Sequence, residues 1–492
     1  MNATAGQRPV TATLSSISHW IDGKPVAGGG RVAPVYNPSL GRVVREVSLA
    51  TSAEVERAVA SAARAFPDWS RHSALRRARV LFRFKELLDR DAKRIARAIS
   101  EEHGKTLDDA LGEVTRGIEV VEFACGAPHL LKGEFSDSVG RGVDSYSLHQ
   151  PLGVVAGVTP FNFPAMVPMW MFPIALVCGN SFVLKPSERD PSASLLLAEL
   201  LTEAGLPDGV LNVVTGFGHE AGKALALHPD VNCLAFTGST RTGRSLMEYS
   251  GQSNLKQVWL ELGGKSPNLI FADTKDLAAA AEMAAFGIFF NAGQVCSANA
   301  RLLVERRIQA EIVERLAAIA AAMQPGDPLD PATRMGALVD HAHLDHVMRF
   351  VEAAPASARL VTGGSRVPLH PRGAFMQPTI FDNVDPGCSL ARDEIFGPVL
   401  SVIPFDTEEE AIRLANDSVY GLAASVWTAD LDRSLRVSDR LNAGTVSVNT
   451  VDALSPQTPF GGMGQSGFGR DLSLHALDKF TALKTVWIKY TA

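Results

Sequence analysis

A chain of 492 residues is too long for one hydrophobic core, so we expect two or three domains. Its 46% hydrophobic and 20% charged residues are ordinary for a globular protein, and a formal net charge of −6 argues against a nucleic-acid partner or an anionic-membrane surface. No apolar run is long enough to span a membrane, and the polar start over residues 1–16 lacks the basic and apolar segments of a secretory signal.

The first 150 residues divide into three stretches. Residues 18–50 alternate and turn, which is typical of hairpins. The next stretch, 52–132, is helical: Thr51 opens the first helix, and further helices are predicted over 74–90, 91–103 and 107–131, with a break at His103-Gly104-Lys105. Residues 133–150 are short polar strands without an apolar face, so they form either an oligomerisation arm or an ordinary surface hairpin.

Residues 151–262 alternate between short apolar or β-branched runs and helical segments. The predicted strands are 152–158, 181–185, 210–214, 232–236 and 257–262. This alternation predicts an α/β fold with a doubly wound parallel sheet. Ligands on such sheets bind at the carboxyl ends of the strands, so we expect the functional residues of this region there.

Two of these strand ends carry residues that suit a dinucleotide. Gly238 and Ser239 stand at a strand-to-helix junction, where small residues let backbone N–H groups approach a pyrophosphate. In isolation, however, Gly-Ser-Thr is more often a plain helix cap. Glu188 can accept both ribose hydroxyls of an adenosine and would repel a 2′-phosphate, which favours NAD over NADP. Lys185 beside it is then a nucleotide contact rather than a solvated charge.

The remaining chain predicts a second α/β unit. Strands are expected within 267–290, 300–305 and 484–490, and helices within 267–290, 308–323 and 341–353. His341, His343 and His346 have no facing ligand cluster, so we interpret them as surface histidines. The last strand should pair with residues 133–150 or with a neighbouring subunit. The five scattered cysteines form no metal-binding spacing, so we expect reduced thiols in a cytoplasmic protein and no metal.

Seven motifs, in this order, closely resemble the aldehyde dehydrogenase superfamily over nearly the whole chain. They are Phe161-Asn162-Phe163-Pro164, Lys185-Pro186-Ser187-Glu188, Phe236-Thr237-Gly238-Ser239-Thr240, Glu261-Leu262-Gly263-Gly264-Lys265, Gly293-Gln294-Val295-Cys296, Glu394-Ile395-Phe396-Gly397-Pro398 and Pro459-Phe460-Gly461-Gly462. The resemblance implies the aldehyde dehydrogenase fold. Its parts would be a doubly wound NAD-binding domain (17–132 and 151–260), an α/β catalytic domain (261–481) and a small β oligomerisation arm (133–150 and 482–492) that makes homodimers or homotetramers.

The resemblance also assigns a site for NAD-dependent oxidation of a small-molecule aldehyde to a carboxylic acid. Cys296 becomes the nucleophile, Glu261 the general base and Asn162 the oxyanion ligand. The implied cofactor-binding residues are Thr159, Pro160, Phe161, Lys185, Ser187, Glu188, Gly238, Ser239, Leu262, Glu394 and Phe396. The implied lining of the substrate tunnel is Phe163, Met166, Val167, Trp170, Val295, Ser297, Leu454 and Phe460. A plain core stripe is the alternative for Met166 and Trp170.

The chemistry of an aldehyde agrees with these roles. An aldehyde has no leaving group except hydride, so a thiolate must add first, and the resulting alkoxide needs a donor such as the Asn162 amide. Loss of hydride leaves a thioester, which water attacks once a base takes its proton. Glu261 would be expensive to bury as a structural charge, which favours such a role. We interpret the other four cysteines as inert core thiols.

The likeness changes along the chain. Up to about residue 205 the chain is most similar to methylmalonate-semialdehyde dehydrogenases, and residues 159–173 are very close to their version. From Leu211 onward it is similar to dehydrogenases of γ-glutamyl-γ-aminobutyraldehyde and related amino-aldehydes. Such a pattern indicates a mosaic, natural or engineered.

Four residues bear on the substrate and on the fate of the acyl group. The semialdehyde enzymes pass their acyl group to coenzyme A, lack a carboxylate at the position of Glu261 and carry an Arg where this chain has Val295. We therefore expect hydrolysis to a free acid. A coenzyme A-acylating semialdehyde dehydrogenase and a catalytically silent NAD-binding scaffold are the alternatives. Arg116 alone is a weak carboxylate clamp. Asp452 is interpreted as a solvated loop acid in preference to a site for a cationic amino-aldehyde.

Overall fold

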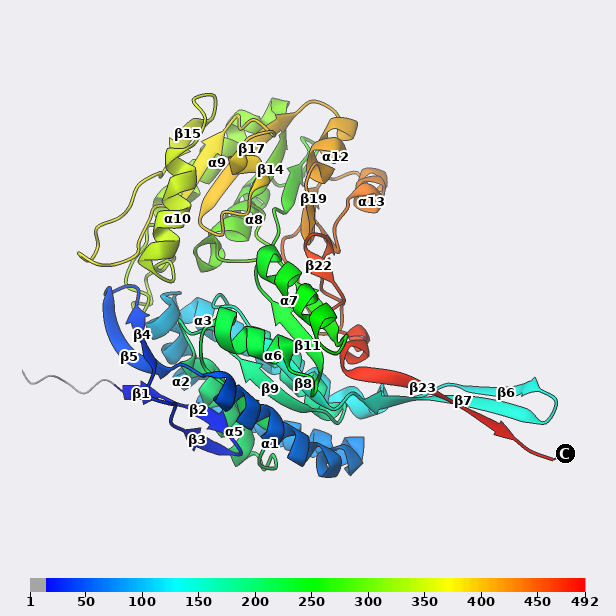
Figure 1. Cartoon of the computed structure of the whole chain (residues 1–492). Coiled ribbons are helices and arrows are strands. Elements are labelled where there is room, and N and C mark those ends of the chain that lie inside the picture. The colour runs from blue at the N-terminus through cyan, green and yellow to red at the C-terminus, as the bar shows by residue number, and fades with distance from the viewer. Residues whose placement is uncertain (1–14, 492) are drawn as a thin grey trace, which may run out of the picture.

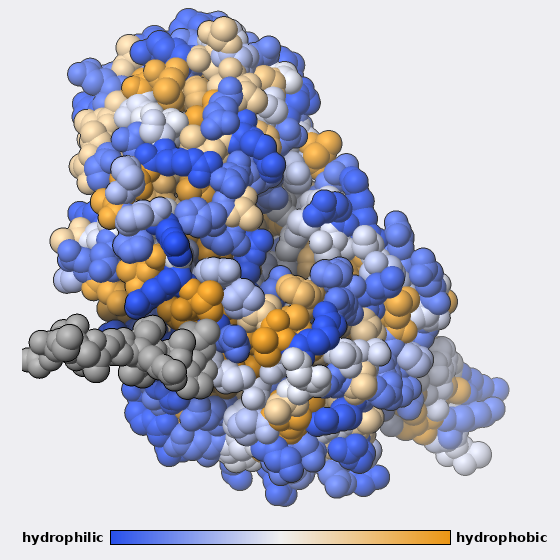
Figure 2. Space-filling model, turned by 60° about the vertical axis from the view of Figure 1, so that its left-hand side comes forward, coloured by the Kyte–Doolittle hydropathy of each residue, from blue (hydrophilic) through white to orange (hydrophobic). Residues whose placement is uncertain are grey.

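The computed structural model describes residues 15–491 as two large mixed sheets with their covering helices and a three-stranded arm that projects from the body (Figure 1). Residues 1–14, which hold most of the predicted polar start, and Ala492 lie outside the described residues. Within residues 15–491, no helix is long and apolar enough to cross a membrane. The face in Figure 2 mixes hydrophilic residues with scattered apolar ones, as is normal for a protein surface.

The first sheet has eight strands in the order β22-β12-β11-β8-β9-β10-β2-β3. Its five central strands are β8 (Val154–Val158), β9 (Ser181–Lys185), β10 (Leu211–Val213), β11 (Val231–Thr237) and β12 (Gln257–Glu261). These five are mutually parallel, so the predicted doubly wound sheet is confirmed. The antiparallel strands at its edges are β22 (Gly467–Phe468), β2 (His19–Ile21) and β3 (Lys24–Val26).

Helices connect the parallel strands of this sheet. They are α4 (Met166–Val177), α5 (Ser192–Glu203), the short α6 (Lys223–Leu227) and α7 (Thr240–Gln252). All twelve residues of α4 are buried. A helix that is apolar all round belongs in a core, and α4 lies in the largest hydrophobic cluster of the molecule.

The N-terminal helices are α1 (Ser52–Arg71), α2 (Ala74–His103) and α3 (Leu107–Gly126). The predicted boundary between residues 90 and 91 is wrong, because α2 runs unbroken over 30 residues. Neither Arg90 nor Asp91 interrupts a helix, and their side chains pair with each other on its surface. The break at Gly104 is confirmed, since its φ of +90° ends α2 in a left-handed cap. Beside α2, a hairpin of β4 (Val32–Asn37) and β5 (Arg42–Ser48) carries β1 (Ser15–Ile17).

The second sheet has seven strands in the order β15-β16-β17-β14-β13-β19-β20. They are β13 (Pro267–Ile270), β14 (Arg301–Glu305), β15 (Arg359–Thr362), β16 (Thr379–Asp382), β17 (Val399–Phe405), β19 (Ala423–Trp427) and β20 (Thr445–Val448). Only β15 is antiparallel to its neighbour. The helices of this part are α8 (Leu277–Phe289), α9 (Gln309–Ala322), α10 (His341–Glu352), the short α11 (Ser389–Arg392), α12 (Glu408–Asn416) and α13 (Leu431–Arg440). The predicted second α/β unit is therefore formed.

The arm consists of β6 (Phe135–Gly140), β7 (Val143–Pro151) and β23 (Thr481–Lys489). β23 pairs antiparallel with β7 along its whole length, from Thr481 opposite Pro151 to Lys489 opposite Val143. This confirms that the C-terminal strand pairs with the 133–150 ribbon. Figure 1 shows the three strands extending away from the rest of the chain.

Candidate active site

Cys296 follows a strained turn at the end of α8. Asn291 and Ala292 both have a φ of +52°, and Gly293 has a φ of +72°. A Cβ on Gly293 would overlap the carbonyl of Gly397, so only glycine fits there. Because non-glycine residues seldom adopt positive φ, the surrounding packing must impose this turn just before Cys296.

The Cys296 thiol is held in its protonated form. Burial raises the pKa of Cys296, and the nearby negative charges of Asp452 and Glu261 raise it further. A thiol is a weak nucleophile until it loses its proton, so this cysteine needs a base beside it. Cys125, Cys178 and Cys233 are buried, and burial raises the pKa of each to about 12, which suits inert core thiols.

Glu261 ends β12, between Thr237 of β11 and Gly467 of β22. Its Oε2 is buried and has no hydrogen-bond partner among residues 15–491. Burial raises the pKa of Glu261 well above its ordinary value, and the negative charge of Asp471 adds to this shift. A carboxyl group with a raised pKa is suited to take protons near neutral pH. A Cβ on Gly461 would lie 2.6 Å from Oε1, so this glycine makes room for the carboxylate.

Asp471 is paired with Lys479. Both side chains are nearly fully buried. The negative charge of Asp471 raises the pKa of Glu261, and the positive charge of Lys479 lowers it. The charge balance around Glu261 therefore depends on Lys479, which sequence analysis does not identify.

Asn162 lies between β8 and α4, and its backbone carbonyl is held from two sides. Lys105 Nζ donates to it at 2.6 Å and Asn291 Nδ2 at 3.1 Å. The Oδ1 atom of Asn162 is buried with no hydrogen-bond partner in the described chain. This orientation leaves Nδ2 as the end of the side chain that can donate to a reacting oxygen. Sequence analysis identifies Lys105 only as part of a helix break.

The carboxyl ends of β8 and β9 bring the predicted nucleotide contacts together. Thr159 N donates to the Lys185 carbonyl at 3.1 Å, and Lys185 Nζ donates to Glu188 Oε2 at 3.1 Å. Burial raises the pKa of Glu188 and is the largest single effect. The Lys185 charge, the hydrogen bonds that the carboxylate accepts and the Arg189 charge together outweigh it, so the net shift is downward and favours the ionised form. Thr159 Oγ1 is buried and unpaired within residues 15–491, and Ser187 Oγ accepts from Arg189 N. A carboxylate and a free hydroxyl at strand ends fit a ribose and its phosphates.

Five further predicted contacts, Phe161, Ser239, Leu262, Glu394 and Phe396, lie in or against the segments that follow β8, β11 and β12. Ser239 is the N-cap of α7 and accepts from Thr242 N at 3.3 Å, so its helix-cap role is realised. Glu394 Oε1 accepts from Gly264 N at 3.2 Å, close to Leu262 in the chain. The ring of Phe396 meets that of Phe161, from the β8–α4 loop, edge-on at 5.7 Å.

The interpretation of His343 as a surface histidine is wrong. Its Nε2 lies 2.7 Å from the Phe396 carbonyl oxygen, and its ring packs edge-on against Phe161 at 5.7 Å. Burial lowers the pKa of His343 to about 4, so the ring is neutral at physiological pH. His341 is exposed, and the half-buried His346 stacks on His343 at 5.9 Å between ring centres.

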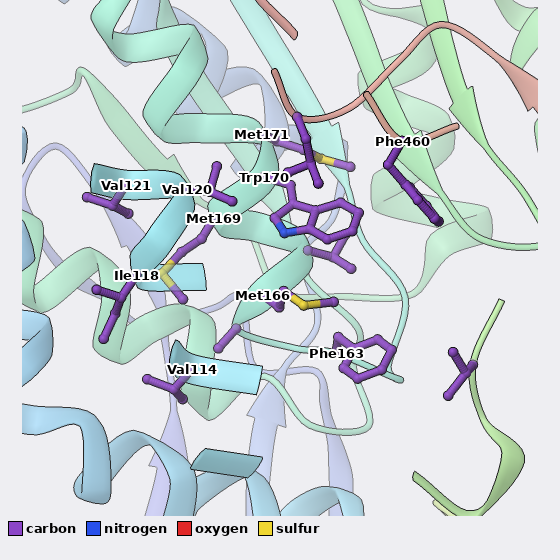
Figure 3. Close-up of a cluster of buried hydrophobic side chains, with 14 of the residues drawn as sticks. Val114, Ile118, Val120, Val121, Phe163, Met166, Met169, Trp170, Met171 and Phe460 are labelled. Atoms are coloured by element: carbon purple, nitrogen blue, oxygen red, sulfur yellow. The ribbon is translucent and has the colours of Figure 1, made fainter. Parts of the chain in front are cut away.

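The predicted tunnel residues form one aromatic and aliphatic wall. Figure 3 shows Met166 and Trp170 projecting from α4 toward Phe163 and Phe460, whereas Met169 points toward Ile118. Trp170 meets Phe460 edge-on at 5.4 Å between ring centres. Met166, Val167 and Val295 are buried in the main core cluster, so these residues serve the core whether or not they also touch substrate. Leu454 and Trp170 line a small hollow that also borders Arg116.

The interpretation of Asp452 as a solvated loop acid is wrong. Its Oδ1 accepts a hydrogen bond of 2.9 Å from Ser297 Oγ, next to Cys296, and the residue is half-buried. Its φ of +51° turns the loop back toward the Cys296 segment. The two residues are 155 positions apart, so no local pattern could have placed them together. No group of three or more side chains arranged to hold a metal ion occurs within residues 15–491.

Comparisons with known proteins agree with this arrangement. The sequence model of the aldehyde dehydrogenase family matches residues 26–486. The NADP/NAD-dependent aldehyde dehydrogenase PuuC of Escherichia coli K12 is 46% identical over 464 residues, which are 94% of this chain and 92% of PuuC. The malonate-semialdehyde dehydrogenase of Pseudomonas aeruginosa PAO1 is 41% identical over 94% of this chain and 93% of that protein.

Solved structures show the same fold. The indole-3-acetaldehyde dehydrogenase AldA of P. syringae, as a cysteine-to-alanine mutant in complex with NAD+ and IAA, superposes with a TM-score of 0.95 at 44% identity and 98% coverage of both chains. The γ-glutamyl-γ-aminobutyraldehyde dehydrogenase of Burkholderia cenocepacia J2315 superposes with a TM-score of 0.94 at 45% identity and 97% coverage of both chains. The chain therefore belongs to the aldehyde dehydrogenase family, and it is an NAD-dependent enzyme that oxidises aldehydes.

Proposed function

We propose that Cys296, Glu261 and Asn162 oxidise an aldehyde and then hydrolyse the acyl-enzyme to a free carboxylic acid. The observation that carries the proposal is Glu261. Its carboxyl is buried at the end of β12 with one oxygen that has no hydrogen-bond partner in the described part of the chain, and its charge acts on the Cys296 thiol. A buried, unpaired carboxyl is costly for folding, so its presence beside a nucleophile supports a role as base.

Each residue then has a defined step. Glu261 accepts the thiol proton of Cys296, and the thiolate adds to the aldehyde carbon. The Asn162 side-chain amide and the Cys296 backbone N–H donate to the resulting alkoxide. When bound, the nicotinamide dinucleotide supplies the acceptor for the hydride that leaves. A thioester remains on Cys296, and Glu261 releases the thiol proton to solvent before hydrolysis. Water then attacks the thioester carbon while Glu261 takes a proton from the water. Collapse breaks the carbon–sulfur bond and releases the acid, and the proton on Glu261 returns to the Cys296 sulfur.

The dinucleotide binds at the carboxyl ends of β8 and β9 in this proposal. Lys185, Glu188 and the unpaired Thr159 hydroxyl would hold its ribose and phosphates, Gly238 and Ser239 would face the pyrophosphate at the start of α7, and Pro160 and Leu262 would flank the nicotinamide. The ionised Glu188 repels a 2′-phosphate, so we propose that the chain prefers NAD to NADP.

We propose an amino-aldehyde as substrate class. Asp452 places a negative charge within electrostatic reach of Cys296, which attracts a substrate ammonium and repels the carboxylate of a semialdehyde. The solved γ-glutamyl-γ-aminobutyraldehyde dehydrogenase and the aminoacetaldehyde dehydrogenase of P. aeruginosa, 41% identical, are relatives whose names specify amino-aldehydes. The ring wall of Trp170 and Phe460 would pack against the carbon chain.

A coenzyme A-acylating enzyme is the second candidate, favoured by the likeness to malonate-semialdehyde dehydrogenase. A silent NAD-binding scaffold is the third. The purified protein should be supplied with NAD and each of an amino-aldehyde, malonate semialdehyde, a medium aliphatic aldehyde and benzaldehyde, with and without coenzyme A. NADH formation without coenzyme A, fastest with the amino-aldehyde, is the expected result.

Two variants sharpen this experiment. Glu261→Gln should form at most about one NADH per active site, and more slowly than the unmodified protein, because Gln takes a proton neither from the Cys296 thiol nor from the hydrolytic water. Asp452→Asn should lower kcat/KM for the amino-aldehyde roughly tenfold while leaving the aliphatic aldehyde within twofold, the loss expected from one charge interaction. Turnover that requires coenzyme A would overturn the hydrolytic role of Glu261, and no turnover in any well would favour the scaffold.

We also propose the assembly and the location. The arm leaves Leu483 and Trp487 of β23 exposed, at 63% and 67%, and such apolar side chains on an open strand favour pairing with a second copy as a homodimer or homotetramer. The NAD-binding, catalytic and arm boundaries predicted above are retained as the domain division. A cytoplasmic location is consistent with five unpaired cysteines within the described residues.

A further inference from the structure

We propose that Lys105 and Glu113, which lie outside the reacting groups, are positioning residues that fix Asn162 for oxyanion binding. The inference rests on the proposed role of Asn162. It starts from an ion pair at the junction of α2, α3 and α4, in which both side chains are completely buried. Lys105 Nζ lies 2.7 Å from Glu113 Oε2.

Lys105 contacts the Asn162 loop directly. Its Nζ donates to the Asn162 carbonyl oxygen at 2.6 Å and lies 4.3 Å from the centre of the Phe163 ring. An ammonium group donates stronger hydrogen bonds than a neutral donor, and a buried one strongly favours a fixed partner. The Asn162 backbone, and with it the direction of its side chain, is therefore tied to the end of α2.

Glu113 holds the other side of the same loop. Its Oε1 accepts from Ala165 N at 2.8 Å and from Met166 N at 3.1 Å. These are the first N–H groups of α4, whose N-cap residue Ala165 supplies no capping side chain. Glu113, on α3, caps α4 in its place, so the segment that carries Asn162 is fixed at both ends.

The pair also connects Asn162 to the nucleophile. The Asn162 carbonyl accepts a second bond from Asn291, whose Nδ2 also donates to the Gln294 carbonyl, two residues before Cys296. Gly104, beside Lys105, accepts from Ala337 N at 2.9 Å and so attaches this corner to the second α/β unit. Two apolar side chains could fill the space of the ion pair, but they could neither donate to Asn162 nor cap α4. The geometry thus assigns the Lys105–Glu113 pair a role in positioning Asn162 relative to Cys296.

The test is a double-mutant cycle between Lys105→Met and Asn162→Ala. Lys105→Met should lower kcat about 10- to 100-fold, the loss expected when an oxyanion donor is misplaced, with KM for NAD changed less than threefold. It should also raise the primary isotope effect measured with the 1-deuterated aldehyde, because hydride transfer becomes slower relative to later steps. In the Asn162→Ala background the same substitution should change kcat less than threefold.

Two further variants complete the design. In Lys105→Met the buried Glu113 charge has no partner, which could prevent folding. The double variant Lys105→Met with Glu113→Gln removes both charges and can then replace the single variant in the same cycle. Lys256→Met is the matched control, since Lys256 is a buried lysine that also donates to a backbone carbonyl, that of Ala226, far from the site. It should lower the melting temperature and leave kcat and the isotope effect unchanged.

The outcomes separate this inference from the proposed function. If Asn162→Ala alone leaves kcat unchanged, the oxyanion role itself is wrong. If Asn162→Ala is slow but Lys105→Met lowers kcat equally in both backgrounds, or lowers only the melting temperature as Lys256→Met does, the pair serves stability and the positioning role is overturned.

Discussion

Glu261 and Glu188 stand near the carboxyl ends of strands in the same sheet, yet their pKa values move in opposite directions. Burial raises the pKa of Glu261 and Asp471 adds to the shift, against the opposing charges of Lys479 and Arg470. The pKa of Glu188 is lowered, with Lys185 3.1 Å away. The first carboxyl suits proton transfer and the second suits holding hydroxyl groups. Burial and neighbouring charges together thus give the same residue type two different chemical properties.

The pH dependence of turnover should show the environment of Glu261. Because its pKa is raised, kcat should increase with pH along a limb that lies above the range of an ordinary carboxyl group. Asp471 raises this pKa, so Asp471→Asn should move the limb to lower pH, which steady-state kcat measured from pH 5 to 10 will detect. A limb that stays in place would mean that another group limits turnover.

Cofactor preference should depend on Glu188. Glu188→Gln keeps the shape but removes the charge, so the KM for NADP should fall about tenfold while the KM for NAD rises a few-fold. Initial rates with each dinucleotide give both values. Glu199→Gln, an exposed glutamate on α5, is the control. An unchanged ratio of the two KM values would place the ribose elsewhere.

At the scale of the element, the arm differs from every other part of the described chain because it packs on no core. β23 is exposed on both faces, and Leu483 and Trp487 lie on the same one, since residues four apart in a strand share a face. Among the described residues, its strand pairing is with β7. An isolated ribbon of this length is marginal in water, so the arm gains most of its order from whatever covers it.

Charging this face should therefore break the assembly. The double variant Leu483→Lys with Trp487→Lys should elute as a monomer in size-exclusion chromatography with light scattering, because two charges cannot be buried unpaired in an interface. Lys484→Ala, on the opposite face of β23, should leave the molar mass unchanged. Identical masses for the double variant and the unmodified protein would show that the arm is not the interface.

For the whole molecule, the two sheets meet at the Gly263–Gly264 segment, and Glu394 ties it to the second sheet's loops. Burial raises the pKa of Glu394 to about 7. The folded state therefore holds this proton more tightly than the unfolded chain, whose glutamate titrates near 4.5. The resulting stabilisation of the folded state is complete below pH 4.5 and is lost as the pH rises toward 7.

Glu394→Gln should remove this dependence. The free energy of unfolding of the unmodified, cofactor-free protein should fall by at most about 3 kcal/mol between pH 5 and pH 8 on account of this group, and the variant should lack that part of the loss. Thermal melts at both pH values measure it, with the exposed neighbour Asp393→Asn as control. Equal pH dependence in all three proteins would refute the raised pKa.

The outcome of sequence interpretation differs between these scales for physical reasons. Local signals encode strands such as Ser181–Lys185 and the break at Gly104. For the strand the signal is a short apolar run, and for the break it is a glycine, which readily tolerates positive φ. The false boundary inside α2 shows the limit of such signals, because charged residues on a helix surface look like a junction when their salt bridges are unknown. The roles of Cys296, Glu261 and Asn162 came from motifs and remain to be tested.

By itself, the sequence determined the family and the parallel sheet, and it left two possible partners for the last strand, the arm or a neighbouring subunit. Only the tertiary structure decided how Asp452 faces Ser297, how His343 joins Phe396 and how Lys105 reaches Asn162 across 57 positions. The reason is that propensity and periodicity act within a few residues of the chain. The burial, charge and hydrogen-bond partners that set a side chain's chemistry come instead from segments that meet only when the core closes.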